Sequence, residues 1–129
     1  MSVLRMDHLV ITVSDLDRAV EFYCNAIGLK LIDQNAEGTL ATLAAGEQLI
    51  RLQTPERAGA LVAAAPAPGT SDLCLEVKEA PAETIARMER LDVEVVAGPV
   101  TRHGVRGEMQ SVYVRDPDGS LIELASYGR

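Results

Sequence analysis

The side chain best placed to do chemistry in this sequence is Glu123, a carboxylate between Ile122 and Leu124. A carboxylate in an apolar strand is costly to bury alone and usually has a cation or a strong hydrogen-bond donor as its partner. Its strand follows the turn at residues 116–119 (Asp-Pro-Asp-Gly), which predicts a β-hairpin over residues 112–126. The partner of Glu123 is therefore the first question that the sequence poses.

The sequence repeats in hydrophobic phase, and the repeat supplies a candidate partner position. When residues 7–32 are aligned with residues 71–96, 64 positions later, apolar residues fall on apolar residues. The same holds when residues 49–52 are aligned with residues 121–124, 72 positions later. The second alignment matches Arg51 with Glu123, and the first matches His8 with Asp72. Four polar side chains thus occupy two pairs of equivalent positions.

The repeated unit predicts a βαβββ module, so we expect an α+β fold of two such modules. Module one covers residues 6–54, a connector 55–70, and module two 71–126. Within module one we expect a strand at 7–13, a helix that begins at 14–17 and ends at Gly28, and strands at 29–34, 39–45 and 48–54. The connector includes a helical turn at 58–65, and the eight extra residues of module two (72 − 64 = 8) predict a longer loop at 102–109.

The alternation along four matched strands predicts one apolar face, which packs under the helices, and one mixed face. The mixed face is predicted to carry polar and apolar side chains together: His8, Val10, Thr12, Leu49, Arg51, Gln53, Asp72, Cys74, Glu76, Leu121, Glu123 and Ala125. Such a face is typical of a ligand cavity, and an ordinary solvated face would show the same composition.

Composition excludes several classes of partner. There are 12 Lys plus Arg against 19 Asp plus Glu, a net charge of −7, which argues against binding to nucleic acid or to anionic membranes. Cys24 and Cys74 lack metal-ligand spacing and are expected to be free thiols in a reducing compartment. No signal peptide or membrane span is apparent, so a cytoplasmic location is expected.

Two stretches resemble a known superfamily: MDHLVITVSDLDRAVEFY at residues 6–23, followed by Ile-Gly-Leu at 27–29, and YVRDPDGSLIE at residues 113–123. They are similar to the vicinal oxygen chelate superfamily, which includes glyoxalase I, extradiol dioxygenases, fosfomycin-resistance transferases and bleomycin-resistance proteins. The resemblance implies a single glyoxalase-like domain, with the modules forming an incomplete barrel around a cavity. It also implies a small-molecule substrate and a homodimer.

The resemblance implies metal ligands at four strand positions, which in this chain are His8, Arg51, Asp72 and Glu123. Imidazole and carboxylates suit a divalent ion such as Mn, Fe, Ni, Mg or Zn, and Glu123 or Asp72 would act as catalytic base. Arg51 cannot bind a cation, because its guanidinium is permanently charged. The expected metal ligands are therefore His8, Asp72 and Glu123, with Arg51 holding an anionic substrate group.

Two functions remain open at this point. The first is a metal-dependent lyase, isomerase or dioxygenase that binds a small oxygenated substrate through two oxygens, with Gln53, Tyr113 and His103 as further substrate-binding residues. Arg115 is expected beside Tyr113 at the cavity rim. The second is a metal-free protein that binds or sequesters a small molecule such as an antibiotic, with an ion pair between Arg51 and Glu123. One Phe, three Tyr and no Trp give little support for stacking of a large planar drug.

Overall fold

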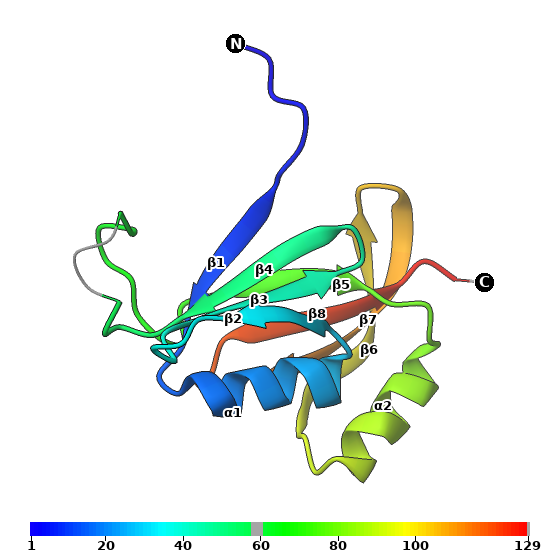
Figure 1. Cartoon of the computed structure of the whole chain (residues 1–129). Helices are drawn as coiled ribbons and strands as arrows, with labels where there is room; N and C mark the ends of the chain where they lie inside the picture. Colours follow the sequence, from blue (N-terminus) through cyan, green and yellow to red (C-terminus); the bar gives the residue numbers. More distant parts are fainter. Residues whose placement is uncertain (58–60, 129) are drawn as a thin grey trace. The chain divides into compact units, whose positions relative to one another are not determined.

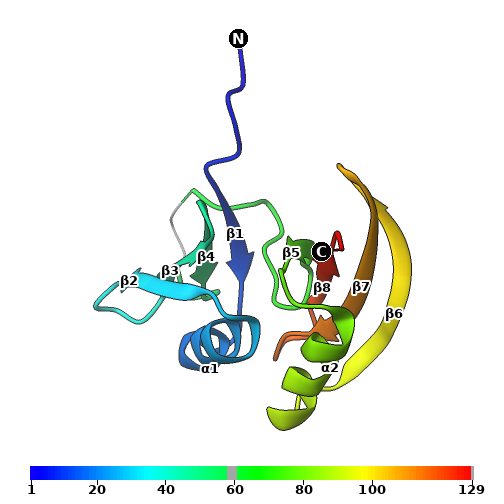
Figure 2. The same ribbon diagram turned by 90° about the vertical axis from the view of Figure 1, so that its right-hand side faces the viewer.

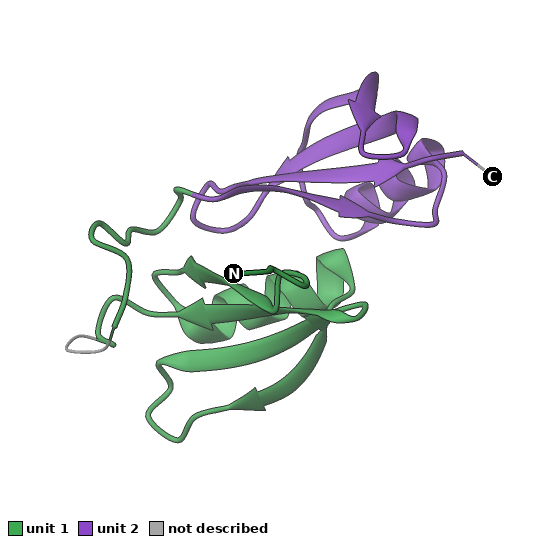
Figure 3. Ribbon diagram, turned by 90° about the horizontal axis from the view of Figure 1, so that it is seen from above, with its two compact units in different colours: residues 1–70 green, residues 71–129 purple. Residues whose placement is uncertain are grey.

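The computed structural model describes residues 1–57 and 61–128, in two compact units that meet in sequence between Thr70 and Ser71 (Figure 3). Each unit has its own four-stranded sheet. Of the helical turn predicted at 58–65, residues 58–60 lie outside the described residues, and residues 61–65 are not helical. None of the described helices is long and apolar enough to cross a membrane.

Unit 1 has the predicted βαβββ order (Figure 1). Its elements are β1 (His8–Thr12), α1 (Leu16–Glu21), the π-helix η1 (Phe22–Ile27), β2 (Lys30–Gln34), β3 (Leu40–Ala45) and β4 (Gln48–Gln53). The strand order is β1-β4-β3-β2, with β1 parallel to β4 and the other pairs antiparallel. The parallel pair is the one that carries His8 and Arg51.

The helix of unit 1 begins and ends at residues suited to capping. Asp15 is the N-cap, and its carboxylate accepts a hydrogen bond from the Arg18 backbone N–H at 3.0 Å. At the other end Gly28 adopts φ 98°, a left-handed conformation that favours glycine, as the sequence predicted. The Tyr23 carbonyl accepts from the N–H groups of both Gly28 and Leu29, which closes the last turn.

Unit 2 repeats the βαβββ order. Its elements are β5 (Asp72–Glu76), α2 (Pro81–Arg90), β6 (Val95–Gly104), β7 (Gly107–Arg115) and β8 (Leu121–Ser126), in the sheet order β5-β8-β7-β6. β5 begins 64 residues after β1 (72 − 8 = 64), which is the shift found in the sequence. The predicted α+β fold of two βαβββ modules is confirmed.

The prediction of a longer loop at residues 102–109 was wrong. Residues up to Gly104 belong to β6, and those from Gly107 belong to β7, so only Val105 and Arg106 form the turn. Gly104 and Gly107 are paired across the ladder, and Gly107 has φ 116°, which allows this tight connection. The extra residues of unit 2 therefore lengthen a curved hairpin (Figure 2).

Each helix packs on the apolar face of its own sheet. α1 contacts β3 and β4, and α2 contacts β6, β7 and β8. Below them, Ile11, Leu52, Val112 and Ile122 have no exposed surface. Because side chains alternate along a strand, burying this face directs the polar residues of the same strands to the opposite face.

The turn between β7 and β8 is held by a buried carboxylate. Asp116 is 5% exposed, and its Oδ1 accepts from the backbone N–H groups of Asp118 and Ser120, each at 2.9 Å. Gly119 follows with φ 97°. These contacts fix the point at which β8, the strand of Glu123, begins.

Replacing Asp116 by alanine should lower the free energy of unfolding by about 2 kcal/mol, because two backbone donors would lose their acceptor. Urea unfolding measures this. Asp116→Asn keeps an oxygen at the same position and should lose less than half as much. An equal loss in both variants would contradict the role assigned to acceptor geometry.

Candidate functional site

An open pocket of about 510 Å³ lies on the mixed face of the sheet of unit 2. Its lining combines charged, aromatic and aliphatic side chains: Asp72, Val96, Ala97, Arg102, Tyr113, Arg115, Leu121 and Glu123. Four of the residues selected from the sequence are therefore gathered in one place: Asp72, Tyr113, Arg115 and Glu123. A concave site with a few convergent polar groups is the usual form of a small-molecule site.

Strand register explains how these residues meet. Across β7, β8 and β5, Tyr113 pairs with Glu123, which pairs with Cys74. One row further along, Arg115 pairs with Leu121, which pairs with Asp72. Directly paired residues share a face of the sheet, so both rows face the pocket side.

Glu123 is held by a buried hydroxyl. Ser111 has no exposed surface, and its Oγ donates to Glu123 Oε2 at 2.6 Å. The hydrogen bond fixes the orientation of the carboxylate and leaves Oε1 for another partner. Within unit 2, the strong hydrogen-bond donor predicted for Glu123 is therefore Ser111.

Glycine brings β6 close to this part of β7. Gly98 has φ 109°, and a Cβ added there would lie 2.5 Å from the carbonyl oxygen of Ser111. Only glycine tolerates both the conformation and the approach. The edge of the pocket that carries Val96 and Ala97 thus depends on Gly98.

The pKa of Cys74 is affected by the negative charge of this surface. Burial raises the pKa of its thiol to about 11, and the carboxylates of Glu123 and Glu76 add to the increase. A thiol with so high a pKa stays protonated at neutral pH and is a poor nucleophile. We therefore assign Cys74 no catalytic role.

In unit 1 the equivalent strand pair holds a histidine and an arginine. His8 Nδ1 lies 2.9 Å from Asp7 Oδ2, and His8 Nε2 lies 3.4 Å from Arg51 Nη1. Arg51 pairs with Val10, as Glu123 pairs with Cys74, so the equivalence inferred from the repeat is confirmed at the level of register. Arg51 Nε is buried and has no hydrogen-bond partner among the described residues.

Gln53 lies two residues further along β4, on the same face as Arg51. Its Nε2 donates to Thr12 Oγ1 at 3.3 Å, and its Oε1 accepts from Arg57 Nη1 at 3.4 Å. The amide is buried, with 5% exposure. Arg51, Gln53 and Arg57 make this end of the face of unit 1 rich in hydrogen-bond donors.

His103 lies outside the pocket lining. It is exposed, near the end of β6, and pairs with Glu108. Its predicted role in substrate binding stays a prediction. The neighbouring Arg102, which sequence reasoning did not select, lines the pocket because its Nε donates to the Tyr113 hydroxyl at 3.1 Å.

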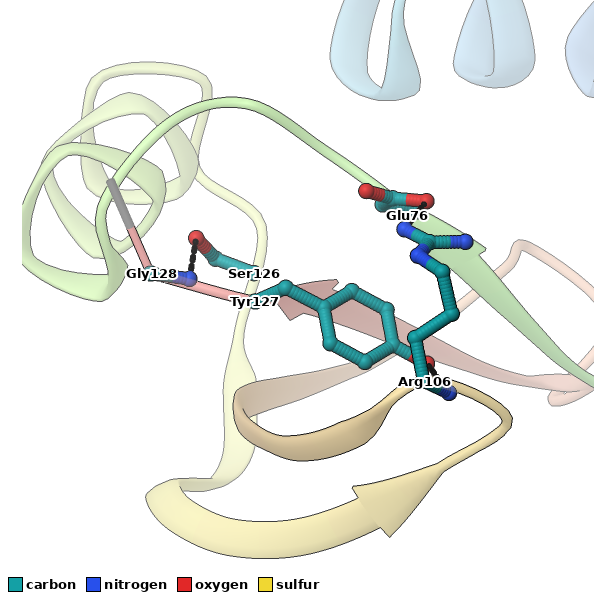
Figure 4. A network of polar contacts seen from close by, with 5 residues as sticks. All are labelled: Glu76, Arg106, Ser126, Tyr127 and Gly128. Carbon is teal, nitrogen blue, oxygen red and sulfur yellow. Dashed lines mark hydrogen bonds and ion pairs between the residues drawn. The ribbon is translucent and has the colours of Figure 1, made fainter.

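The turn of the β6–β7 hairpin is tied to the rest of unit 2 by Arg106 (Figure 4). Its Nη2 donates to Glu76 Oε1 at 2.6 Å, and its guanidinium carbon lies 4.4 Å from the centre of the Tyr127 ring. Gly104 leaves room for this ring, because a Cβ there would collide with the Tyr127 hydroxyl. The contacts support the long hairpin that carries Arg102 and Tyr113.

The predicted metal ligands come from different units. His8 belongs to unit 1, whereas Asp72 and Glu123 belong to unit 2. Within either unit, the described residues contain no group of three His, Cys, Asp or Glu side chains that could hold a metal ion. The three-ligand set stays a prediction.

Comparison with known proteins gives a consistent family. The family model described as the Glyoxalase/Bleomycin resistance protein/Dioxygenase superfamily matches residues 5–124. The chain is 39% identical to the glyoxalase domain-containing protein RDO1 of Mycosarcoma maydis, over 98% of this chain and 70% of that protein. It is 36% identical to the virulence protein STM3117 of Salmonella typhimurium, over 98% of this chain and 87% of that protein.

Solved structures agree. The crystal structure of STM3117 covers 99% of this chain and 100% of its own chain, with TM-score 0.89 and 35% identity. An integron cassette protein of V. cholerae covers 99% and 98%, with TM-score 0.90 and 34% identity. The Listeria monocytogenes fosfomycin resistance protein FosX, solved with Mn(II), and the Streptomyces antibiotic-binding protein TnmS3 are 21% and 22% identical, with TM-scores 0.69 and 0.75, and share the fold alone.

Removing the charge of Glu123 should make Cys74 more reactive. The Glu123 carboxylate helps to raise the pKa of the thiol, so Glu123→Gln should lower that pKa and speed alkylation of Cys74 between pH 8 and about 10. Mass spectrometry of the Cys74 peptide after timed iodoacetamide treatment measures the rate. Glu108→Gln, an exposed change on β7, should leave it unchanged. An unchanged rate in Glu123→Gln would contradict the coupling.

Proposed function

This chain belongs to the Glyoxalase/Bleomycin resistance protein/Dioxygenase superfamily, and we propose that it is a metal-dependent enzyme within it. Its substrate is a small oxygenated molecule bound through two oxygens, and its reaction is that of a glyoxalase-type lyase or isomerase, or of a dioxygenase. The observation that carries the proposal is the carboxylate of Glu123, oriented by the buried Ser111 at an open pocket.

The hydrogen bond from Ser111 prepares Glu123 to bind a cation. One carboxylate oxygen is occupied, and the other is free among the described residues. Metal-binding carboxylates are commonly oriented by such outer hydrogen bonds, which fix the ligand before the ion arrives. Because the pocket is open, an ion from solvent can reach the free oxygen.

His8 has a similar supporting partner. A neutral ring that donates from Nδ1 to the Asp7 carboxylate, 2.9 Å away, would present the lone pair of Nε2 to an ion. A carboxylate behind a histidine is the usual arrangement for a metal-binding imidazole. We assign His8, Glu123 and Asp72 as the metal ligands, and this set of one nitrogen and two oxygen donors fits Mn, Fe, Ni, Mg or Zn.

A bound divalent ion would supply Lewis-acid chemistry to the substrate oxygens. The protein side chains do the rest. Glu123 or Asp72, when released from the ion, would accept a proton from the substrate, while Arg51 and Gln53 bind its polar groups. Tyr113 donates from the pocket wall, and His103 is proposed to contact substrate from the β6–β7 hairpin.

The second candidate is a metal-free protein of the same fold that binds or sequesters a small molecule. One contact favours it: Arg51 Nη1 lies 3.4 Å from His8 Nε2, the atom that would bind the metal. A permanent cation near a ligand nitrogen opposes metal binding. At 3.4 Å the hydrogen bond is weak, so an ion can displace it at small cost. In either case we propose a homodimer, which size-exclusion chromatography with light scattering would establish.

Metal analysis decides between the two functions. Purified protein, reconstituted with Mn, Fe, Ni, Mg or Zn and then desalted, should hold a stoichiometric amount of at least one metal. His8→Ala and Glu123→Gln should each weaken binding of that metal by at least about tenfold, because each removes a ligand. Hemithioacetals and catechols are the first substrates to assay with the loaded protein.

The chain offers matched controls for both variants. His103→Ala removes the other histidine, and Glu108→Gln removes an exposed carboxylate of β7, and both should retain the wild-type metal content. A protein that takes up none of the five metals would eliminate the enzyme proposal and leave the metal-free binder. Equal metal loss in variants and controls would refute the ligand assignment.

A further inference from the structure

We propose that Arg102 and Arg115 form an anion-binding end of the pocket in unit 2, so that the ligand is a small organic acid with a carboxylate or a phosphate-type group. The inference rests on the proposed role of this pocket as the substrate site. It adds what that proposal leaves open, which is the chemical class of the ligand. The evidence is that both arginines line this pocket and that neither has a carboxylate partner among the described residues.

The Arg115 side chain is held by a hydrogen bond to the backbone but has no carboxylate partner among the described residues. Its Nη1 donates to the Gly119 carbonyl at 3.0 Å, which ties the side chain to the turn before β8. Among residues 1–57 and 61–128, no carboxylate lies within ion-pair distance of it. The remaining N–H donors of a guanidinium suit an oxyanion.

Arg102 is held on several sides. Its Nε donates to the Tyr113 hydroxyl at 3.1 Å, its Nη1 donates to the Thr101 carbonyl at 3.2 Å, and its guanidinium carbon lies 5.7 Å from the Tyr113 ring centre. It too has no ion-pair partner in the part of the chain that the structure describes. Nη2 makes no hydrogen bond to a described residue, so this donor is available to a ligand.

Tyr113 adds a neutral donor to the two arginines. Its oxygen accepts from Arg102, so its own O–H proton is available for a ligand oxygen. Tyr113 and Arg115 are two residues apart on β7 and lie on the same face. The three side chains supply charge-assisted and neutral donors together, which is how proteins bind carboxylate and phosphate oxygens.

The carboxylates of the same pocket lie on the other strands. Asp72 is on β5 and Glu123 on β8, whereas Arg102 and Arg115 are on β6 and β7. The pocket is thus polarised, with donors on β6 and β7 and acceptors on β5 and β8. Leu121 lies between Arg115 and Asp72, and Val96 and Ala97 lie on the donor side, on β6.

The distribution of donors and acceptors in the pocket indicates how the ligand is oriented. Its acidic group binds at Arg102 and Arg115, and its hydroxyl groups face Asp72 and Glu123. The short carbon chain that joins them lies over Leu121. A pocket of about 510 Å³ that is open to solvent suits a compact molecule of this kind.

Titration of the full chain with three simple anions tests the inference. The probes are inorganic phosphate, methylphosphonate and glycolate, each added at constant ionic strength. Binding is measured by the change in the amide chemical shifts of unit 2. Saturable shifts should appear at residues 96–97, 113–115 and 121 with at least one probe. Arg102→Gln and Arg115→Gln should each weaken binding by about tenfold, and the double variant should abolish it.

Two further variants make the test specific. Arg90→Gln, on the exposed face of α2, causes the same change in net charge outside the pocket and should bind as the wild type does. Arg102→Lys keeps the charge but loses the planar fork, so it should retain part of the affinity. Both mutated arginines of the pocket are exposed, and amide spectra of the free variants report whether each folds.

Each outcome bears on the inference. Response to glycolate alone identifies a carboxylic acid, and response to the phosphorus anions alone identifies a phosphoric or phosphonic acid. No saturable response to any probe, or unchanged binding in the double variant, would overturn it. Binding lost in Glu123→Gln but kept in the double arginine variant would place the anion on the metal instead. Metal content of the same samples is measured separately, so anion binding without metal would retain this site while removing the proposed enzyme.

Discussion

The hydrogen bond from Ser111 to Glu123 is the interaction on which the site in unit 2 depends. A carboxylate on a half-buried strand is unstable without a donor, and a fully buried hydroxyl at 2.6 Å supplies one. The hydroxyl is in place because β7 and β8 pair in one register, with Tyr113 opposite Glu123 and Ser111 opposite Ala125. The Asp116 turn sets that register, and Gly98 lets β6 complete the pocket edge.

The two units have equivalent strand positions that carry side chains of opposite charge. Arg51 and Glu123 occupy matching positions in the two units, paired with Val10 and Cys74. Unit 1 therefore presents an imidazole beside a guanidinium, and unit 2 presents carboxylates beside a hydroxyl. A symmetric shell of four metal ligands, two from each module, does not fit this chain, because a guanidinium cannot bind a cation.

The fold does not determine which reaction or ligand the protein has, and particular side chains reduce the number of possibilities. Proteins of this fold include one solved with Mn(II) and one named for antibiotic binding, so architecture alone does not separate enzyme from binder. In unit 2 the oriented carboxylate of Glu123 is suited to a cation. In unit 1 the Asp7–His8 contact is also suited to one, whereas the neighbouring Arg51 opposes it. The Arg106 contacts to Glu76 and Tyr127 serve the hairpin on which the pocket arginines sit.

The sequence by itself determined the α+β class, the two βαβββ modules, the helix end at Gly28 and the pairing of Arg51 with Glu123 as equivalent positions. These follow from alternation, capping and repetition, which are local or periodic properties of the chain. Only the tertiary structure decided that residues 102–109 are a tight hairpin, that Ser111 holds Glu123, and that Arg102 reaches Tyr113. Those contacts depend on register between separate strands and on side-chain direction, and neither leaves a periodic signal in the residues themselves.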